Sequence, residues 1–379
     1  MFGIGFVAST LNLRNEDFLA GKLTFGGNAN AGGIVNQGAI ATPGGGSVYL
    51  IAPNVSNDGL ITTPGGETIL AAGQTVQLLD TATPGVKVEV TGATGNVTNL
   101  GNIVAEAGRI GMAGVLVRNS GTLNASSVVS AGGRIFLKAS QDTYVDKNAN
   151  IAATGSRGGD IEVLGQRVAV MDNTVLDASG QNGGGSVLVG GDYQGRNTAV
   201  QNAAVTWFGP DATLKADATV KGDGGKVIVW ADDTTRAYGT ISARGGSEGG
   251  NGGFVETSGH YLDVNGIRVD TGANRGTVGT WLLDPDNLTI TAAASATLDG
   301  NGTNGTPFAP QAGGGNLDRG TLQTNLGSGS VYVQATGDIT GDDSITWAAA
   351  NALSLTAGNT ITIADPISGA AGQLMLTAG

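Results

Sequence analysis

Short apolar runs with alternating polar positions recur along the chain, and many of them follow a glycine pair. Clear copies are GGSVYLIA from Gly45, GGRIFLKAS from Gly132, GGSVLVGGD from Gly184 and GGKVIVWAD from Gly224. Alternation over about four to eight residues is typical of a strand with one buried face. No segment has a convincing apolar stripe at helical spacing. The pattern therefore predicts an all-β protein of short strands joined by glycine-rich turns.

A second motif, Asn-x-Gly, sets a period of about 21 residues. Its asparagines stand at positions 36, 57, 99 and 119, so the three steps between them correspond to one, two and one period. The copy due near residue 78 is replaced by strand-like residues 75–79 and 87–90.

The glycine pairs show a slightly longer period in the middle of the chain. A nearly constant step separates the second residues of four successive Gly-Gly or Ala-Gly pairs, which are Gly108, Gly133, Gly159 and Gly185. The next one, Gly225, comes much later than this step predicts. An insertion therefore lies between Gly185 and Gly225.

A repeat of this length accommodates two or three short strands, and the leucine-rich repeat pattern is absent. The remaining architecture is a parallel β-helix, a solenoid in which each repeat forms one coil and coils stack about 4.8 Å apart. We expect coils over residues 31–290 and 327–379. Residues 291–326 are rich in Gly, Ala and Asn and predict an irregular excursion with at most a short helical turn at 317–322.

Stacking of equivalent residues gives these motifs structural roles. Apolar ladders, with Val227, Val229 and Phe254 among them, are expected to fill the interior, and glycine is expected where coil corners need positive φ. The Asn-x-Gly asparagines are expected to stack and hydrogen bond along the rod rather than to bind a ligand. This structural ladder consists of Asn36, Asn57, Asn99 and Asn119.

Composition excludes several classes of protein. The 379 residues include 67 glycines, against a usual share of about 7%. The net charge is −12 without a basic cluster, so a nucleic-acid partner is not expected. The chain has no cysteine, which excludes disulfides and metal–thiolate sites. Residues 1–7 do not form a signal peptide and no run of about 18 apolar residues occurs, so we expect no export signal within this chain.

Carboxylates are the first candidates for chemistry, because some β-helix proteins cleave acidic polysaccharides. Neighbours in a strand point to opposite faces, so the adjacent pairs Asp232–Asp233 and Asp342–Asp343 do not by themselves place two carboxylates together. A hydrolase needs two carboxylates about 5–9.5 Å apart. Stacked coils could supply them from three turn aspartates: Asp217, Asp223 and Asp233. We expect solvated turn residues and no catalytic residue.

Metal and cofactor sites have weaker support. Residues 245–253 have the glycines of a calcium loop but only one carboxylate, Glu248. No Lys-Ser/Thr pair follows these glycines and no helix begins there, which argues against a phosphate loop. The single histidine, His260, has no partner that the sequence identifies. We therefore expect no metal and no cofactor.

Large aromatic and acidic side chains are the candidates for surface contacts. Exposed aromatic rings could stack on the sugars of a glycan, whereas buried ones would seal the core where an insertion leaves the coil. The candidates are Trp207, Phe208, Tyr193, Asp232 and Asp233.

Several motifs, taken in order, resemble one family of exported proteins. Residues 7–12 (VASTLN) and 15–21 (NEDFLAG) resemble the last part of the secretion domain of filamentous haemagglutinin-like exoproteins. Further motifs similar to that family are GGDYQG at 190–195, VIVWAD at 227–232, ISARGG at 241–246, GGFVETSG at 252–259 and WLLDPDN at 281–287. The resemblance extends over nearly the whole chain.

The resemblance implies a right-handed β-helix that is exported by two-partner secretion through a dedicated outer-membrane transporter. Residues 1–30 would then be the tail of a secretion-type domain, continuous with the rod. The implied function is a non-enzymatic adhesin module that binds host or neighbouring cells, through a receptor or glycan, or displays distal domains. The full-length parent would be secreted or on the cell surface. The alternatives are a polysaccharide lyase or hydrolase and the stalk of a contact-dependent toxin. Unpaired strands at the rod ends also predict end-to-end self-association.

Overall fold

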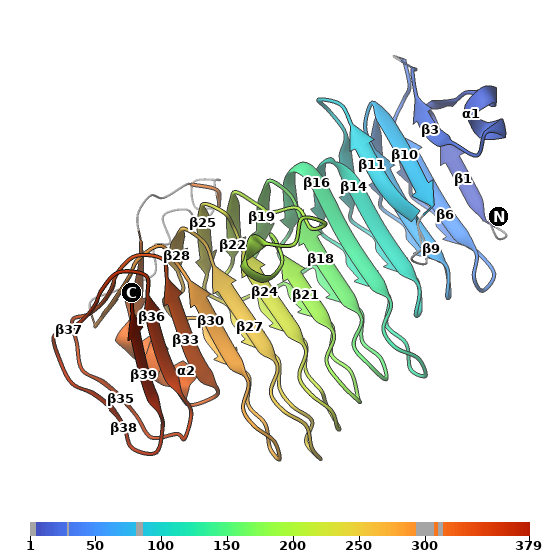
Figure 1. Ribbon diagram of the computed structural model, residues 1–379. Helices are drawn as coiled ribbons and strands as arrows, with labels where there is room; N and C mark the ends of the chain where they lie inside the picture. Colours follow the sequence, from blue (N-terminus) through green and yellow to red (C-terminus); the bar gives the residue numbers. More distant parts are fainter. Residues whose placement is uncertain (1–4, 29, 81–85, 293–306, 310–313) are drawn as a thin grey trace.

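The chain winds into a rod of stacked coils, with its two termini at opposite ends (Figure 1). The computed structural model describes residues 5–28, 30–80, 86–292, 307–309 and 314–379. Successive coils pair in parallel and in register, as Val187 does with Val227 and Val227 with Val255. The predicted parallel β-helix is confirmed. Most coils contribute one strand to each of three faces.

The first face contains the longest ladder of the rod. Its strands, in spatial order, are β1 (Phe6–Ser9), β6 (Ser47–Ala52), β9 (Glu67–Ala72), β14 (Arg109–Asn119), β16 (Arg134–Val145), β18 (Asp160–Leu164), β21 (Ser186–Val189), β24 (Lys226–Trp230), β27 (Phe254–Ser258), β30 (Thr280–Asp284), β33 (Ser330–Ala335), β36 (Leu353–Ala357) and β39 (Leu374–Ala378). Strands β14 and β16 are long because they continue onto the second face.

The second and third faces contain shorter strands. The second face has β4 (Ile34–Asn36), β7 (Asn54–Asn57), β12 (Asn96–Asn99), the ends of β14 and β16, then β19 (Arg167–Val170), β22 (Val205–Phe208), β25 (Thr234–Ala237), β28 (Tyr261–Asp263), β32 (Gly315–Asp318), β31 (Leu288–Thr291), β34 (Ile339–Gly341) and β37 (Ile361–Ile363). The third face has β5 (Ala39–Ala41), β8 (Leu60–Thr62), β13 (Asn102–Val104), β15 (Thr122–Asn124), β17 (Asn150–Ala152), β20 (Val175–Asp177), β23 (Thr213–Lys215), β26 (Thr240–Ser242) and β29 (Arg268–Asp270), with β35 (Ile345–Trp347) and β38 (Ile367–Gly369) as a separate pair.

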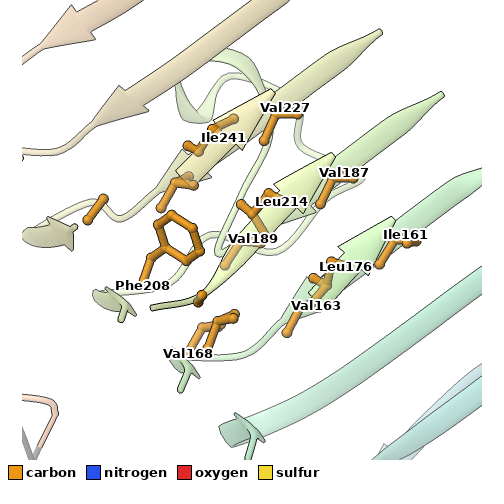
Figure 2. Packing of buried hydrophobic residues seen from close by; sticks show 14 of the residues in the cluster. Ile161, Val163, Val168, Leu176, Val187, Val189, Phe208, Leu214, Val227 and Ile241 are labelled. Atoms are coloured by element: carbon orange, nitrogen blue, oxygen red, sulfur yellow. The ribbon is translucent and has the colours of Figure 1, made fainter. Parts of the chain in front are cut away.

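Aliphatic ladders from all three faces meet inside the coils. Figure 2 shows Val187 and Val189 of the first face beside Leu214 of the third face and Phe208 of the second. These side chains are fully buried. The ladders stack one apolar side chain on another from coil to coil, so burial of apolar surface stabilises every coil through its neighbours.

A second apolar core lies outside the coils, on the first face near the N-terminus. The antiparallel strands β2 (Asn12–Leu13), β3 (Leu23–Gly26), β10 (Thr75–Asp80) and β11 (Val86–Thr91) form a sheet that covers it, and the short helix α1 (Asn15–Leu19) connects β2 to β3. Outward side chains such as Tyr49 and Ile69 are buried with Phe25 and Val76. The hairpin β10–β11 is the insert that replaces one Asn-x-Gly copy.

A helix takes the place of one third-face strand near the C-terminal end. In the segment predicted to be irregular, residues 315–326 form β32 and helix α2 (Arg319–Leu326). The Asp318 carboxylate caps the helix by accepting from the Thr321 N–H at 2.7 Å. The side chain of Asn325 bonds to the backbone of Ile267 and of Val269 in β29, and these bonds attach the helix to the preceding coil. Residues 293–306 and 310–313 of the same segment lie outside the described residues.

Close backbone approach, rather than positive φ, explains the repeated glycine pairs. Gly225 does not have a positive φ, but a Cβ on it would overlap the carbonyl oxygen of Gly185 in the preceding coil. The expectation of positive φ was wrong for this column, although Gly45 and Gly65, the first residues of two earlier pairs at the same corner, do have it (78° and 63°). Only glycine lets adjacent coils approach at the spacing of the strand ladders.

Candidate functional site

A long insertion crosses the outer surface of the first face, and we call its residues 190–204 the strap. It leaves the coil after β21 and returns at β22, and it contains the 3₁₀ turn η1 (Tyr193–Gly195). Glycines shape it, because a Cβ on Gly191 or Gly195 would collide with the Trp230 ring. Gln194 has a φ of 52°, a left-handed conformation that is unfavourable for a residue with a side chain.

Polar contacts hold the strap across several successive coils. The Lys226 ammonium of β24 lies 2.7 Å from the Asp192 carboxylate. The backbone N–H of Gln194 points to both carboxyl oxygens of Glu256 on β27, each at 3.2 Å. Its side-chain amide donates to Asp284 on β30 at 3.3 Å and to the side-chain oxygen of Gln334 on β33 at 3.2 Å. A single strap residue therefore connects three coils.

The carboxyl groups of the strap and of the strands below it have shifted pKa values. Glu256 is completely buried. Burial raises the pKa of Glu256 to about 7, the charges of Asp284 and Asp192 act in the same direction, and bonds from Gln194 and Ser258 oppose the shift. Burial also raises the pKa of Asp284. Burial opposes ionisation of Asp192 as well, but bonds from Asn197, Lys226 and the Tyr193 N–H leave its pKa lowered.

The predicted surface residues divide into buried and exposed ones. Phe208 points into the coil and is fully buried, and Trp207 points outward but is 2% exposed beneath Tyr238 and Phe308. The prediction that these two rings are available for surface contact is therefore wrong. Tyr193 is 45% exposed and rests its ring on Phe254 in an edge contact, with centroids 5.7 Å apart.

The remaining acidic candidates lie beside the strap. Asp232 and Asp233 are exposed. The Asp232 carboxylate accepts from the Asn202 amide and the Trp230 indole, each at 2.9 Å. Asp232 thus fixes the returning end of the strap. The strap brings Tyr193 and Asp232 onto one outer surface. The prediction that Phe254 lies in the interior is wrong, because Val255 is the residue of this strand that is buried inside the coil.

The four motif asparagines stack at one corner of the rod. The Asn36 amide donates to the Asn57 side-chain oxygen at 2.7 Å, Asn57 to Asn99 at 2.8 Å and Asn99 to Asn119 at 2.8 Å. Asn57, Asn99 and Asn119 are fully buried. Each of these three also donates to the carbonyl of the glycine two residues further on. Their polar atoms are thus engaged within the protein.

The turn aspartates bind neighbouring coils. Asp217 accepts from the Ser242 hydroxyl at 2.8 Å and the Arg244 N–H at 2.7 Å, and Asp223 accepts from the Asn251 N–H at 2.7 Å. Burial raises the pKa of Asp217. His260 is exposed and bonds to Asp286 at 2.8 Å, which raises the pKa of its imidazole. In the described parts of the chain, no three His, Cys, Asp or Glu side chains group as a metal site.

One groove is lined by charged side chains, and several of them form ion pairs with other residues of the protein. It has a volume of about 500 Å³ and is lined by corner glycines with Glu67, Arg109, Arg134 and Asp160. Glu67 accepts from the Tyr49 hydroxyl at 2.7 Å and lies 3.0 Å from Arg109. Arg134 lies 2.6 Å from Glu162. These pairs engage Glu67, Arg109 and Arg134 within the protein.

Sequence reasoning identified the insertion but missed Glu256 and Gln194. Glu256 stands in a short apolar run, and its strand position alone does not reveal that a loop covers it. The long step between Gly185 and Gly225 was the signal for the strap. Within the described ranges, no helix is long and apolar enough to span a membrane.

Stacked coils, a covering sheet and a strap define a rod-like parallel β-helix protein. No protein-family model and no curated protein matches the sequence. Among solved structures, the secretion domain of HMW1 from Haemophilus influenzae is 34% identical, with a TM-score of 0.64, and the match covers 74% of each chain. The likeness thus extends well beyond residues 1–30. The chain belongs to the filamentous haemagglutinin-like exoproteins of two-partner secretion systems.

Proposed function

We propose that this chain is the transporter-recognised part of a secreted exoprotein and contributes a non-enzymatic rod to adhesion at the cell surface. The likeness to a secretion domain over 74% of the chain is the observation that carries the proposal. The partner would be an outer-membrane transporter of the two-partner type, and residues 1–30 would be part of the region that it recognises. The full-length parent would be secreted or remain at the cell surface.

Export is expected to depend on the transporter. The chain, fused behind a signal peptide, would be produced in a Gram-negative host with or without the two-partner transporter from its own genome. We expect folded protein in the medium only when the transporter is present, as measured by immunoblot of medium and periplasm. A periplasmic protein with the same signal peptide controls for lysis. Retention despite the transporter, or release without it, would contradict the proposal.

Adhesion is proposed to use the outer surface, where Tyr193, Asp232 and Asp233 are exposed. The partner would be a receptor or glycan on a host or neighbouring cell. Binding of labelled protein to cells, before and after glycosidase treatment, tests this. The alternative, a polysaccharide-cleaving enzyme, is tested by incubating the chain with uronate and neutral polysaccharides. Turnover would overturn the non-enzymatic proposal.

This 379-residue polypeptide is also expected to associate end to end. Among the described strands, β39 pairs with β36 alone, and Leu374 and Leu376 are exposed on it. Unpaired strand edges favour pairing with another chain. Light scattering over a range of concentrations measures the mass, and a monomer at every concentration would count against the prediction.

A further inference from the structure

The strap covers a carboxyl group, Glu256, that forms an ion pair with none of the described residues. Glu256 is fully buried, and its neighbours in the outward ladder, Ile228 on β24 and Leu282 on β30, are buried apolar side chains. The donors that reach it are the Gln194 N–H and the Ser258 hydroxyl. An ionised Glu256 would therefore sit among apolar groups with few hydrogen bonds, which is costly.

The charged groups around Glu256 add to this cost. Asp192 on the strap and Asp284 on β30 are both acids and repel a second negative charge. The cation on β24, Lys226, binds Asp192, and Arg196 on the strap acts on Asp284. These cations are thus engaged by other carboxylates. Glu256 consequently holds its proton to a higher pH while the strap is in place than it would in water.

Of the elements that surround Glu256, the strap is the one that can move away most easily. The coils are held by continuous ladders of parallel strands. The strap bonds to the coil backbone at its ends, Gly190, Ala203 and Ala204, but between residues 191 and 202 side-chain bonds and the Gln194 N–H hold it to the coils. Gln194, its main contact, has the unfavourable φ of 52°. Release of the strap would let water reach Glu256 without breaking a strand ladder. It would also uncover outward side chains of β24 and β27, among them Ile228 and Phe254.

We propose that the strap is a pH-sensitive latch, closed over the first face while Glu256 is protonated and released when Glu256 ionises. The latch does not rest on the proposed role in adhesion, although Tyr193 of the proposed adhesion surface lies on the strap. The buried form has the higher proton affinity, so its stabilisation is complete below the ordinary pKa of glutamate and is lost as the pH rises through about 7. Release of the strap in neutral to alkaline solution would expose an apolar outer surface that the strap covers in acid.

Hydrogen exchange on the intact chain tests the latch. Protection factors, corrected for intrinsic exchange at each pH, would be measured at pH 6 and pH 8. We expect protection of strap amides, including Gln194, to fall about tenfold between these values, from the shift to about 7. Amides of Val227 and Val255 in the strand ladders should show no such change. The drop should disappear in Glu256→Gln, which keeps the shape but cannot ionise.

Glu162 provides a matched control, because it occupies the same outward ladder three coils earlier and is paired with Arg134. Glu162→Gln should retain the tenfold drop. If Glu256→Gln does not fold, Asp284→Asn serves instead, and its drop should be smaller because one repelling charge is gone. A drop that persists in Glu256→Gln, is undiminished in Asp284→Asn, or is absent from the wild-type chain would overturn the latch.

Discussion

Replacing Gly101 by alanine is expected to destabilise the rod by about 3 kcal/mol, whereas the same change at Gly38 costs less than about 0.5 kcal/mol. Both glycines end an Asn-x-Gly motif. A Cβ on Gly101 would overlap the carbonyl oxygen of Gly59 in the preceding coil, but a Cβ on Gly38 meets no atom within 4 Å. The coils cannot separate locally, because strands β12 and β13 are paired on both sides.

The shift of the urea midpoint measures this difference in the free energy of unfolding. Gly38 makes a strict control, since it has the same motif, the same neighbouring asparagine and no positive φ. Equal midpoints for Gly38→Ala and Gly101→Ala would show that coil spacing does not require glycine in this column. A loss of stability at both positions would instead point to a local conformational need of the turn.

The sequence predicted the repeating part of the rod because a repeat imposes equal spacing on residues that stack. The four asparagines are separated by one or two periods, which places them on one line; they are Asn36, Asn57, Asn99 and Asn119. The doubled step locates the hairpin β10–β11. Where two adjacent residues of a strand are both apolar, the periodicity did not show which of them points into the rod. Phe254 and Val255 illustrate this, because only the pairing of Val255 with Val227 sets Val255 inward.

The elements outside the repeat were less accessible to sequence reasoning. Helix α2 has a weak apolar stripe and depends on Asn325 bonding to Val269 of β29, which lies far earlier in the sequence. The covering of Glu256 by Gln194 likewise joins residues from distant parts of the chain. Such contacts leave no local signal in one sequence. The same holds for Trp207, whose burial depends on Phe308 returning over the second face.

The second large loss of stability is expected when one asparagine is removed from the middle of the asparagine ladder. Asn99→Ala leaves a donor of Asn57 and the oxygen of Asn119 without their partners in a fully buried corner. An unsatisfied buried polar group costs about 1–3 kcal/mol, so the expected loss is roughly 2–6 kcal/mol. Urea unfolding measures it. Asn36→Ala, at the end of the ladder, should lose about half as much, because the buried group that it deprives of a partner is the Asn57 oxygen, whereas the Gly38 N–H that also bonds to Asn36 belongs to an exposed residue.

The variant Asn99→Asp separates hydrogen bonding from packing, since it preserves the shape of the side chain. At neutral pH the new carboxylate would face the oxygen of Asn119, acceptor against acceptor, and would be a buried charge. Burial raises the pKa of such a group, so protonation at low pH restores the donor and part of the stability. The free energy of unfolding of this variant, relative to wild type, should therefore recover as the pH falls. If Asn99→Asp is as stable as wild type at every pH while Asn99→Ala is not, the ladder contributes through packing alone.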